Sequence, residues 1–115
     1  MAATEVRKPW LAHYPPGVAH EIPEDCGTLI DIFERAVTTF AERPALESFG
    51  VRMTYAALGE TARKIASALH VAGLNKGDRV AVMMPNVMAY PPVVYGILLA
   101  GGVVVNVNPL YTARE

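Results

Sequence analysis

Residues 80–113 are the stretch that most restricts the fold of this chain, because none of them carries a charged side chain. A stretch of this length exceeds the ~20 apolar residues that a membrane-spanning helix needs. Prolines, glycines and asparagines interrupt it, however, and no single helix of spanning length fits between them. The interrupting residues are Pro85, Asn86, Pro91, Pro92, Gly101, Gly102, Asn106, Asn108 and Pro109. The stretch therefore favours the buried core of an α/β fold over a membrane span.

Two continuous apolar runs within this stretch have the length of strands. They are residues 80–84 (VAVMM) and 103–107 (VVVNV), and an apolar helix is expected between them, from Pro91 to Ala100. Continuous apolarity predicts central parallel strands that are buried on both faces, joined by a right-handed crossover. Ligands of such sheets bind beyond the carboxyl ends of the strands. Those ends are residues 85–86 and 108–112.

The first half of the chain predicts an arm, two helices and a hairpin. Residues 1–27 are rich in proline and show no helical period, so we expect an extended arm that lies across a surface. Its expected anchors are Trp10, Leu11, Tyr14 and Ile22. Residues 45–54 predict two short strands around Gly50, which together would form a hairpin.

The two expected helices flank this hairpin and have recognisable ends. Thr28 with Asp31 predicts a capped helix, which the Arg43-Pro44 pair should end. Its expected apolar stripe consists of Leu29, Phe33, Val37 and Phe40. Thr54 should cap the next helix, and Gly73 should end it. The expected buried stripe of that helix is Leu58, Ala62, Ile65 and Leu69.

Composition suggests that the chain buries surface against additional protein. Hydrophobic residues make up 52% of the chain and charged residues only 18%, whereas average domains carry about 25% charged residues. A small independent domain should show the opposite bias. We therefore expect the front end of a longer protein, whose catalytic residues lie after residue 115.

Charge and cysteine content exclude some classes of protein and indicate a compartment. The net charge is −1, and the sequence contains no cluster of basic residues that would indicate nucleic-acid binding. The one cysteine, Cys26, cannot form an internal disulfide, which fits a reducing compartment. Residues 1–27 lack the apolar core of a signal peptide. A cytoplasmic protein is the expectation.

Few residues are candidates for chemistry, and most have a simpler explanation. His13, His20 and Cys26 are spaced by seven and six residues, which matches no compact zinc site. His70 lies near the end of its helix, where a partial positive charge is favourable. Tyr111 follows the last strand directly, and we retain it as a candidate for lining a ligand site.

Two glycine-containing segments also lack the spacing of nucleotide-binding motifs. AGLNKGDR (72–79) lacks the spacing of a phosphate-binding loop and precedes a strand. GILLAGG (96–102) does not match the dinucleotide fingerprint. Its glycines are better explained by a helix end and by close packing of helix against strand.

Three segments in order resemble the acyl-adenylate-forming enzymes. MTYAAL (53–58), KGDRVAVMMPN (76–86) and LLAGGVVVNVNP (98–109) resemble core segments of that superfamily, over residues 28–115 as a whole. Within it, KPWLAHYPPGVAHEIP (8–23) and VVNVNPLYTARE (104–115) are most similar to bacterial long-chain fatty-acid–CoA ligases. The double proline at 91–92 departs from the family pattern and leaves the start of that helix open.

The resemblance implies a fold and a two-step reaction. Residues 28–115 would form an incomplete N-terminal subdomain of the adenylate-forming large domain, after the arm of residues 1–27. A fatty acid and Mg-ATP would form an acyl-adenylate, and coenzyme A would displace AMP to give the thioester. The family's phosphate loop, adenine-site motif and C-terminal lysine have no counterpart here. No catalytic, cofactor-binding or metal-binding residue is therefore assigned, and the substrate-binding residues stay unknown.

Alternatives to this interpretation remain open. The chain could be a stand-alone interaction or membrane-surface module without catalysis. Within the superfamily, medium-chain and aryl acid–CoA ligases share the same core segments. The resemblance also leaves open a homodimer, to which the arm could contribute, and a peripheral contact with the inner face of the membrane. The expected partner in every version of the enzyme is the remainder of the same chain.

Overall fold

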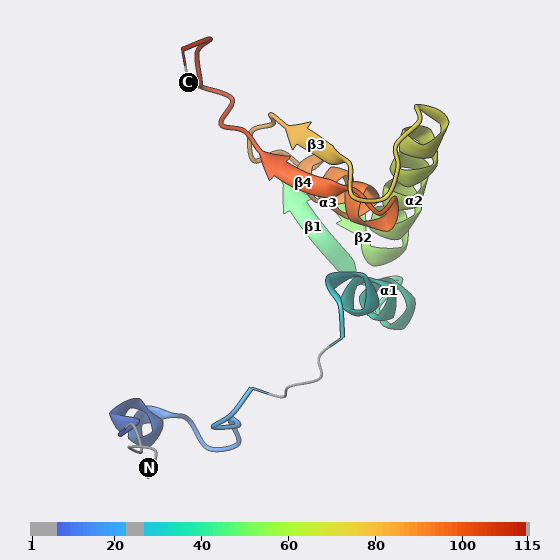
Figure 1. Cartoon of the computed structure of the whole chain (residues 1–115). Coiled ribbons are helices and arrows are strands. Elements are labelled where there is room, and N and C mark those ends of the chain that lie inside the picture. The colour runs from blue at the N-terminus through green and yellow to red at the C-terminus, as the bar shows by residue number, and fades with distance from the viewer. Residues whose placement is uncertain (1–6, 23–26, 115) are drawn as a thin grey trace.

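The computed structural model describes residues 7–22 and 27–114. Over these residues the chain forms a short 3₁₀ helix, three α-helices and four strands (Figure 1). The strands form an antiparallel pair and a parallel pair, and each pair is a separate sheet. This arrangement confirms the predicted α/β class with a hairpin, three helices and a parallel strand–helix–strand unit.

The described part of the arm, residues 7–22, lies apart from the α-helices and strands (Figure 1). Its 3₁₀ helix, η1 (Pro9–His13), contains no buried residue. Trp10 is 50% exposed and Ile22 is 85% exposed. The described body therefore does not cover these two side chains, and the expectation that apolar side chains anchor the arm across a surface stays a prediction.

The first helix, α1 (Leu29–Thr39), begins with the predicted capping box. The Asp31 N–H donates to Thr28 Oγ1 at 3.2 Å, and the Thr28 N–H donates to Asp31 Oδ2 at 2.7 Å. Phe33 and Val37 are buried as predicted. The ends of the predicted stripe are exposed instead, Leu29 by 61% and Phe40 by 40%, because α1 meets the described body only through its middle.

Helix α1 ends before the predicted Arg43-Pro44 boundary, and its C-cap is Phe40. The carbonyl groups that follow it accept bonds from the next helix instead of continuing α1. Tyr55 N–H donates to the Arg43 carbonyl at 3.0 Å, and Ala56 N–H donates to the Ala41 carbonyl at 2.9 Å. These contacts satisfy N–H groups that the first turn of a helix leaves unpaired.

The hairpin consists of β1 (Pro44–Ser48) and β2 (Val51–Thr54), which pair antiparallel as predicted. After it, α2 (Tyr55–Val71) is capped by Thr54 Oγ1, which accepts from the Ala57 N–H at 3.2 Å. Of the predicted stripe, Leu58 and Ala62 are buried, while Ile65 and Leu69 are half-buried.

Helix α2 and the third helix, α3 (Tyr90–Leu99), end in the same way. Gly73 has φ 93°, and its N–H donates to the His70 carbonyl, while the Leu74 N–H donates to the Leu69 carbonyl. This pair of bonds is the Schellman motif. Gly101 and Gly102 repeat it after α3. Both glycine segments are thus helix ends, as predicted.

The parallel sheet consists of β3 (Arg79–Val82) and β4 (Val103–Asn106), with Val82 opposite Asn106. Helix α3 joins the two strands and packs against β4. Val82 is buried, but Ala81 and Val105 are exposed. The prediction of central strands buried on both faces is therefore wrong for the described residues, since α3 covers one face and each strand has one paired neighbour.

The core lies between the three helices and the hairpin. It contains Phe33, Val37, Leu58 and Ala62. The Phe33 ring stacks on Tyr95 of α3, with ring centroids 4.2 Å apart. At the α2–α3 contact, a Cβ on Gly96 would lie 2.6 Å from Ile65 Cγ2 and 3.0 Å from the Ala62 carbonyl oxygen. Only glycine fits there without a shift of one helix.

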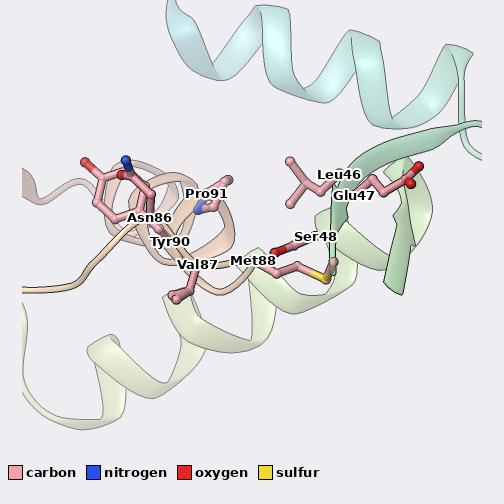
Figure 2. Close-up of a pocket in the computed structure, with 8 residues that line it drawn as sticks. All are labelled: Leu46, Glu47, Ser48, Asn86, Val87, Met88, Tyr90 and Pro91. Atoms are coloured by element: carbon pink, nitrogen blue, oxygen red, sulfur yellow. The ribbon is translucent and has the colours of Figure 1, made fainter. Parts of the chain in front are cut away.

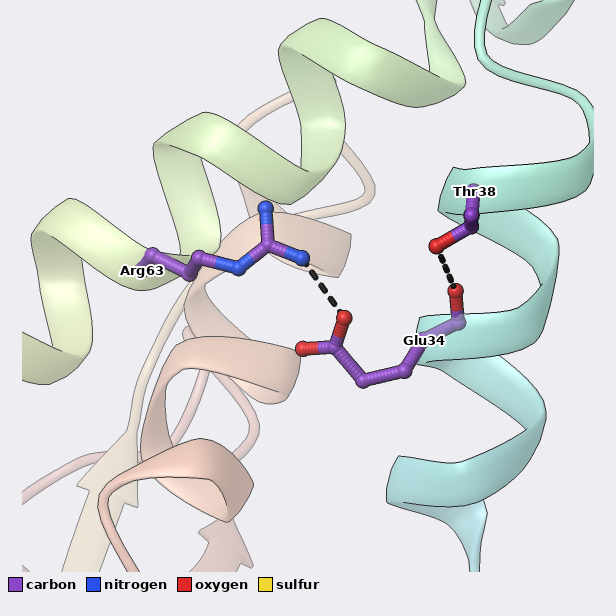
Figure 3. Close-up of polar contacts among 3 residues, drawn as sticks. All are labelled: Glu34, Thr38 and Arg63. Atoms are coloured by element: carbon purple, nitrogen blue, oxygen red, sulfur yellow. Dashed lines mark hydrogen bonds and ion pairs between the residues drawn. The ribbon is translucent and has the colours of Figure 1, made fainter.

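A polar contact joins α1 to α2 at the surface (Figure 3). Arg63 Nη2 donates to Glu34 Oε2 at 2.6 Å, and Thr38 Oγ1 donates to the Glu34 carbonyl at 2.7 Å. Both charged side chains are more than a third exposed, so this ion pair adds little stability. Among residues 7–22 and 27–114, none of the helices combines the length and apolar character that crossing a bilayer requires.

Candidate functional site

An open groove of about 370 Å³ lies where the two parallel strands end. Its lining residues come from both strands, from the loops that follow them and from the first turn of α3. They are Val82, Met84, Asn86, Tyr90, Asn106, Val107, Asn108 and Tyr111. The groove therefore lies where the topology of the sheet predicts a ligand, and Tyr111 lines it.

One hydrogen bond connects the two sides of this groove. Tyr90, at the start of α3, donates from its hydroxyl to Asn106 Oδ1 at 2.7 Å. Asn106 is the last residue of β4 and lies opposite Val82 of β3. The bond thus fixes the first turn of the helix against the end of the sheet, and it positions both polar groups at the wall of the groove.

A turn after β4 determines where Tyr111 lies. Asn108 Oδ1 accepts from the Leu110 N–H at 3.0 Å, and the Asn108 carbonyl accepts from the Tyr111 N–H at 3.0 Å. An asparagine followed by proline commonly begins such a turn. The turn brings Tyr111 back toward the strand ends, where its side chain remains 54% exposed.

The chemistry of the groove is that of uncharged groups. Its lining offers amide and phenol groups beside valine and methionine, without a carboxylate or a basic side chain. Such a wall can donate and accept hydrogen bonds and can contact apolar surface. It holds no nucleophile with an adjacent base and no cation to offset phosphate charge. The groove can bind, but the described residues do not equip it for catalysis.

A second pocket of about 260 Å³ lies between β1 and the loop before α3 (Figure 2). It shares Asn86 and Tyr90 with the groove. Leu46 and Ser48 point from β1 toward this loop, whereas Glu47 turns to the other side (Figure 2). The remaining lining residues are Val87, Met88 and Pro91. The two pockets thus share part of the loop that precedes α3.

Among the carboxyl groups of residues 7–22 and 27–114, three have lowered pKa values, and these three lie outside both pockets. A hydrogen bond from Lys8 lowers the pKa of Glu21, and one from Lys64 lowers that of Glu60. The pKa of Asp31 is lowered mainly by the hydrogen bond from the Thr28 side chain. These shifts come from surface ion pairs and a helix cap, so they do not indicate an acid or base for catalysis.

The candidates His20 and His70 do not line the groove. His20 contacts the Tyr14 ring edge-on within the arm, 5.7 Å between ring centroids. His70 is exposed in the last turn of α2. Cys26 lies outside the described residues. Over the part of the chain that is described, the His, Cys, Asp and Glu side chains form no group of three that could hold a metal ion.

Sequence reasoning missed Tyr90 and Asn106. The expected strand continued to residue 107, so Asn106 was placed within it. The expected helix began at Pro91, so Tyr90 was placed in the loop before it. The structure ends β4 at Asn106 and begins α3 at Tyr90. The sequence did contain a signal for Asn106, because this polar residue interrupts an apolar run of valines.

Comparison with known proteins now identifies the family. The sequence profile of the family described as AMP-binding enzyme matches residues 33–115. The chain belongs to the AMP-binding enzyme family. This AMP-binding enzyme chain is 49% identical over 112 residues to the long-chain-fatty-acid–CoA ligase of Salmonella typhimurium. That match covers 96% of the chain and 20% of the ligase, so the chain spans about a fifth of the relative's length.

Solved structures of AMP-binding enzymes share this fold. A putative long-chain-fatty-acid CoA ligase from Rhodopseudomonas palustris is 31% identical with a TM-score of 0.71, over 76% of this chain and 22% of that one. The N-terminal subdomain of Klebsiella oxytoca NpsA is 29% identical with a TM-score of 0.71, over 75% of this chain and 23% of that one. These matches confirm the predicted resemblance and its fold class.

Proposed function

We propose that this chain forms the N-terminal part of an ATP-dependent ligase, which activates a long-chain fatty acid as an acyl-adenylate and transfers it to coenzyme A. The observation that supports the proposal is the 49% identity to a long-chain-fatty-acid–CoA ligase across 96% of the chain. The arm of residues 1–27 and the subdomain of residues 28–115 are the two parts that it would contribute.

The groove at the strand ends does not fit Mg-ATP by itself. Magnesium sites use carboxylate oxygens together with phosphate oxygens, and the groove has no carboxylate. It also lacks the lysine or arginine that would attract phosphates. In the proposed enzyme, ATP supplies the adenylyl group and Mg²⁺ offsets phosphate charge, and residues outside the described ones hold both. The described residues position the strand ends and leave an uncharged wall.

The partners and location of the protein complete this proposal. The exposed face of β3 and β4 would be covered by the remainder of the same chain, because exposed parallel strands are rare. We retain a homodimer involving the arm, a cytoplasmic location and a peripheral contact with the inner face of the membrane as parts of the proposal. Each needs its own measurement.

The test begins with the protein encoded by the reading frame that contains this sequence. We expect it to form acyl-CoA from palmitate, ATP and coenzyme A, with ATP–pyrophosphate exchange that depends on the fatty acid. Octanoate and benzoate serve as substrates for the medium-chain and aryl alternatives. Faster thioester formation with either would contradict the long-chain assignment, and a stop codon directly after Glu115 would favour the interaction module.

A chimera tests whether this segment supports such a ligase. The 112 matching residues would replace their counterpart in the Salmonella typhimurium ligase. We expect the chimera to retain acyl-CoA formation, and the same chimera with Gly96→Leu to lose it, because leucine cannot fit between α2 and α3. The 115-residue chain alone should show no ATP–pyrophosphate exchange. Exchange above a mock preparation would contradict that expectation.

A further inference from the structure

Helix α3 begins without a side-chain cap, unlike α1 and α2. Its N-cap residue, Ala89, makes no side-chain hydrogen bond, whereas Thr28 and Thr54 cap the other two helices. Pro91 and Pro92 lie in the first turn, where their fixed φ angles make the backbone stiff. They lack N–H groups, so this turn has few donors for a cap to satisfy. The position of this stiff turn relative to the sheet therefore depends on side-chain contacts.

The Tyr90 side chain provides such a contact. Its hydroxyl donates to Asn106 Oδ1 at 2.7 Å, and so joins the start of α3 to the end of β4. The backbone bonds of the loop stay local, since the Val87 N–H donates to the Pro85 carbonyl and the Tyr90 N–H donates to the Val87 carbonyl. Over the described part of the chain, no other side-chain hydrogen bond links residues 85–90 to β4.

The loop that this bond holds contributes to both pockets. Asn86 and Tyr90 line the groove at the strand ends and also the pocket beside β1. Val87 and Met88, which lie between them in the sequence, line the second pocket. A displacement of this loop would therefore change the walls of both pockets at once.

We propose that Tyr90 is a positioning residue of the ligase proposed above, on whose activity this inference rests. Tyr90 acts through Asn106 and holds residues 85–89 against the end of the sheet. Because the bond lies at an open surface, water can replace it with little loss of stability. Its main effect is on the position of the ligand wall, and a displacement of about 1 Å in an active site can lower the rate roughly a hundredfold.

The test compares two tyrosines of the same helix in the protein encoded by the reading frame that contains this sequence. Tyr90→Phe removes the bonded hydroxyl. Tyr95→Phe is the control, because the Tyr95 ring stacks on Phe33 while its hydroxyl makes no hydrogen bond to the described residues. The KM and kcat of acyl-CoA formation are measured for palmitate, ATP and coenzyme A, each varied in turn.

We expect Tyr90→Phe to raise the KM of at least one substrate about tenfold, and Tyr95→Phe to change none of them. A merely structural role would lower the amount of folded enzyme, which reduces the apparent kcat and leaves KM unchanged. Unchanged KM values for all three substrates in Tyr90→Phe would therefore overturn the proposal.

A double substitution tests whether Tyr90 acts through Asn106. In the Asn106→Ala background the acceptor is already absent, so Tyr90→Phe should cause no further loss of kcat/KM. If the two losses add, Tyr90 acts independently of Asn106, and the proposed mechanism is wrong.

Hydrogen exchange separates this inference from the proposed activity. Amide exchange in residues 86–90, followed by mass spectrometry, should be faster in Tyr90→Phe and unchanged in Tyr95→Phe, with or without acyl-CoA formation by the parent. A parent that makes no acyl-CoA but shows this difference would contradict the ligase and would support the link between Tyr90 and the loop. Equal exchange in Tyr90→Phe and the parent would overturn the positioning role even in an active ligase.

Discussion

The helix layer and the groove at the strand ends differ in how closely their side chains pack. Between α2 and α3, Gly96 has no room for a methyl group, and the buried ring of Phe33 in α1 stacks on Tyr95. The groove is open to solvent, and its two walls are joined by the bond from Tyr90 to Asn106. Close packing tolerates few side chains, whereas an open polar wall tolerates many.

This difference indicates which region maintains the fold and which is free to serve a ligand. Substitutions in the helix layer should change the free energy of unfolding strongly, because packed interiors cannot adapt to altered volume. Substitutions in the groove should leave the fold intact, because water can replace the lost contacts. The comparison can be tested by substitutions in each region.

The largest expected effect comes from Phe33→Ala. Phe33 is 3% exposed and stacks on Tyr95, and truncation of a buried phenylalanine typically lowers the free energy of unfolding by about 3–5 kcal/mol. Urea unfolding followed by circular dichroism measures the loss. Leu29→Ala in the same helix is the control, because Leu29 is 61% exposed and should lose far less. Similar losses for both variants would show that Phe33 is not in a packed core.

Gly96→Ala should have the next largest effect. Alanine in an exposed helix position would be favoured over glycine by about 1 kcal/mol, but here its methyl group would collide with Ile65 and the Ala62 carbonyl. We expect the free energy of unfolding to fall by about 1–3 kcal/mol.

A double substitution tests the cause of that loss. Ile65→Ala removes the side chain that the new methyl group would meet. The loss caused by Gly96→Ala should therefore be smaller in the Ile65→Ala background than in the parent chain. Additive losses would mean that the two helices are not in direct contact at this point. A gain in stability from Gly96→Ala alone would exclude the close approach altogether.

Local features of the chain could be predicted from its sequence because they depend on neighbouring residues. Thr28 and Thr54 cap the N-termini of α1 and α2 as expected, and Gly73 ends α2 as expected. Caps can be predicted because they satisfy backbone groups within one turn. The parallel strand–helix–strand unit and its carboxyl-end groove follow from the same local patterns together with topology. Tyr111 was recognised for that reason.

Burial could not be predicted in the same way, because it depends on what lies across from a side chain. Leu29 and Phe40 have helical spacing, but the described body covers them only in part. Val103 and Val105 belong to a continuous apolar run, yet one sheet face remains exposed. The left-handed conformation of Phe49, with φ 49°, was also missed, since the neighbouring Gly50 alone seemed to account for the turn.

The cap of α1 predicts a smaller, pH-dependent effect. Hydrogen bonds from Thr28 lower the pKa of Asp31 below its ordinary value of 3.8. Its contribution to stability is therefore complete above pH 3.8 and is lost as the pH falls through the lower pKa of the folded state. Asp31→Asn should flatten this part of a stability–pH curve measured by urea unfolding. An unchanged acid slope would show that other carboxyl groups determine it.

Tyr90→Phe should have the smallest effect on stability. It removes the hydroxyl that donates to Asn106 Oδ1, yet both groups face the open groove, where water can take their place. We expect a loss of about 0.5 kcal/mol, the lower limit for a hydrogen bond, with unchanged circular dichroism. Val94→Ala, on the half-buried surface of the same helix, is the control and should cost more. If Tyr90→Phe instead lowered the free energy of unfolding as much as Gly96→Ala, the groove would be part of the framework of the fold, and its value as a variable ligand wall would be lost.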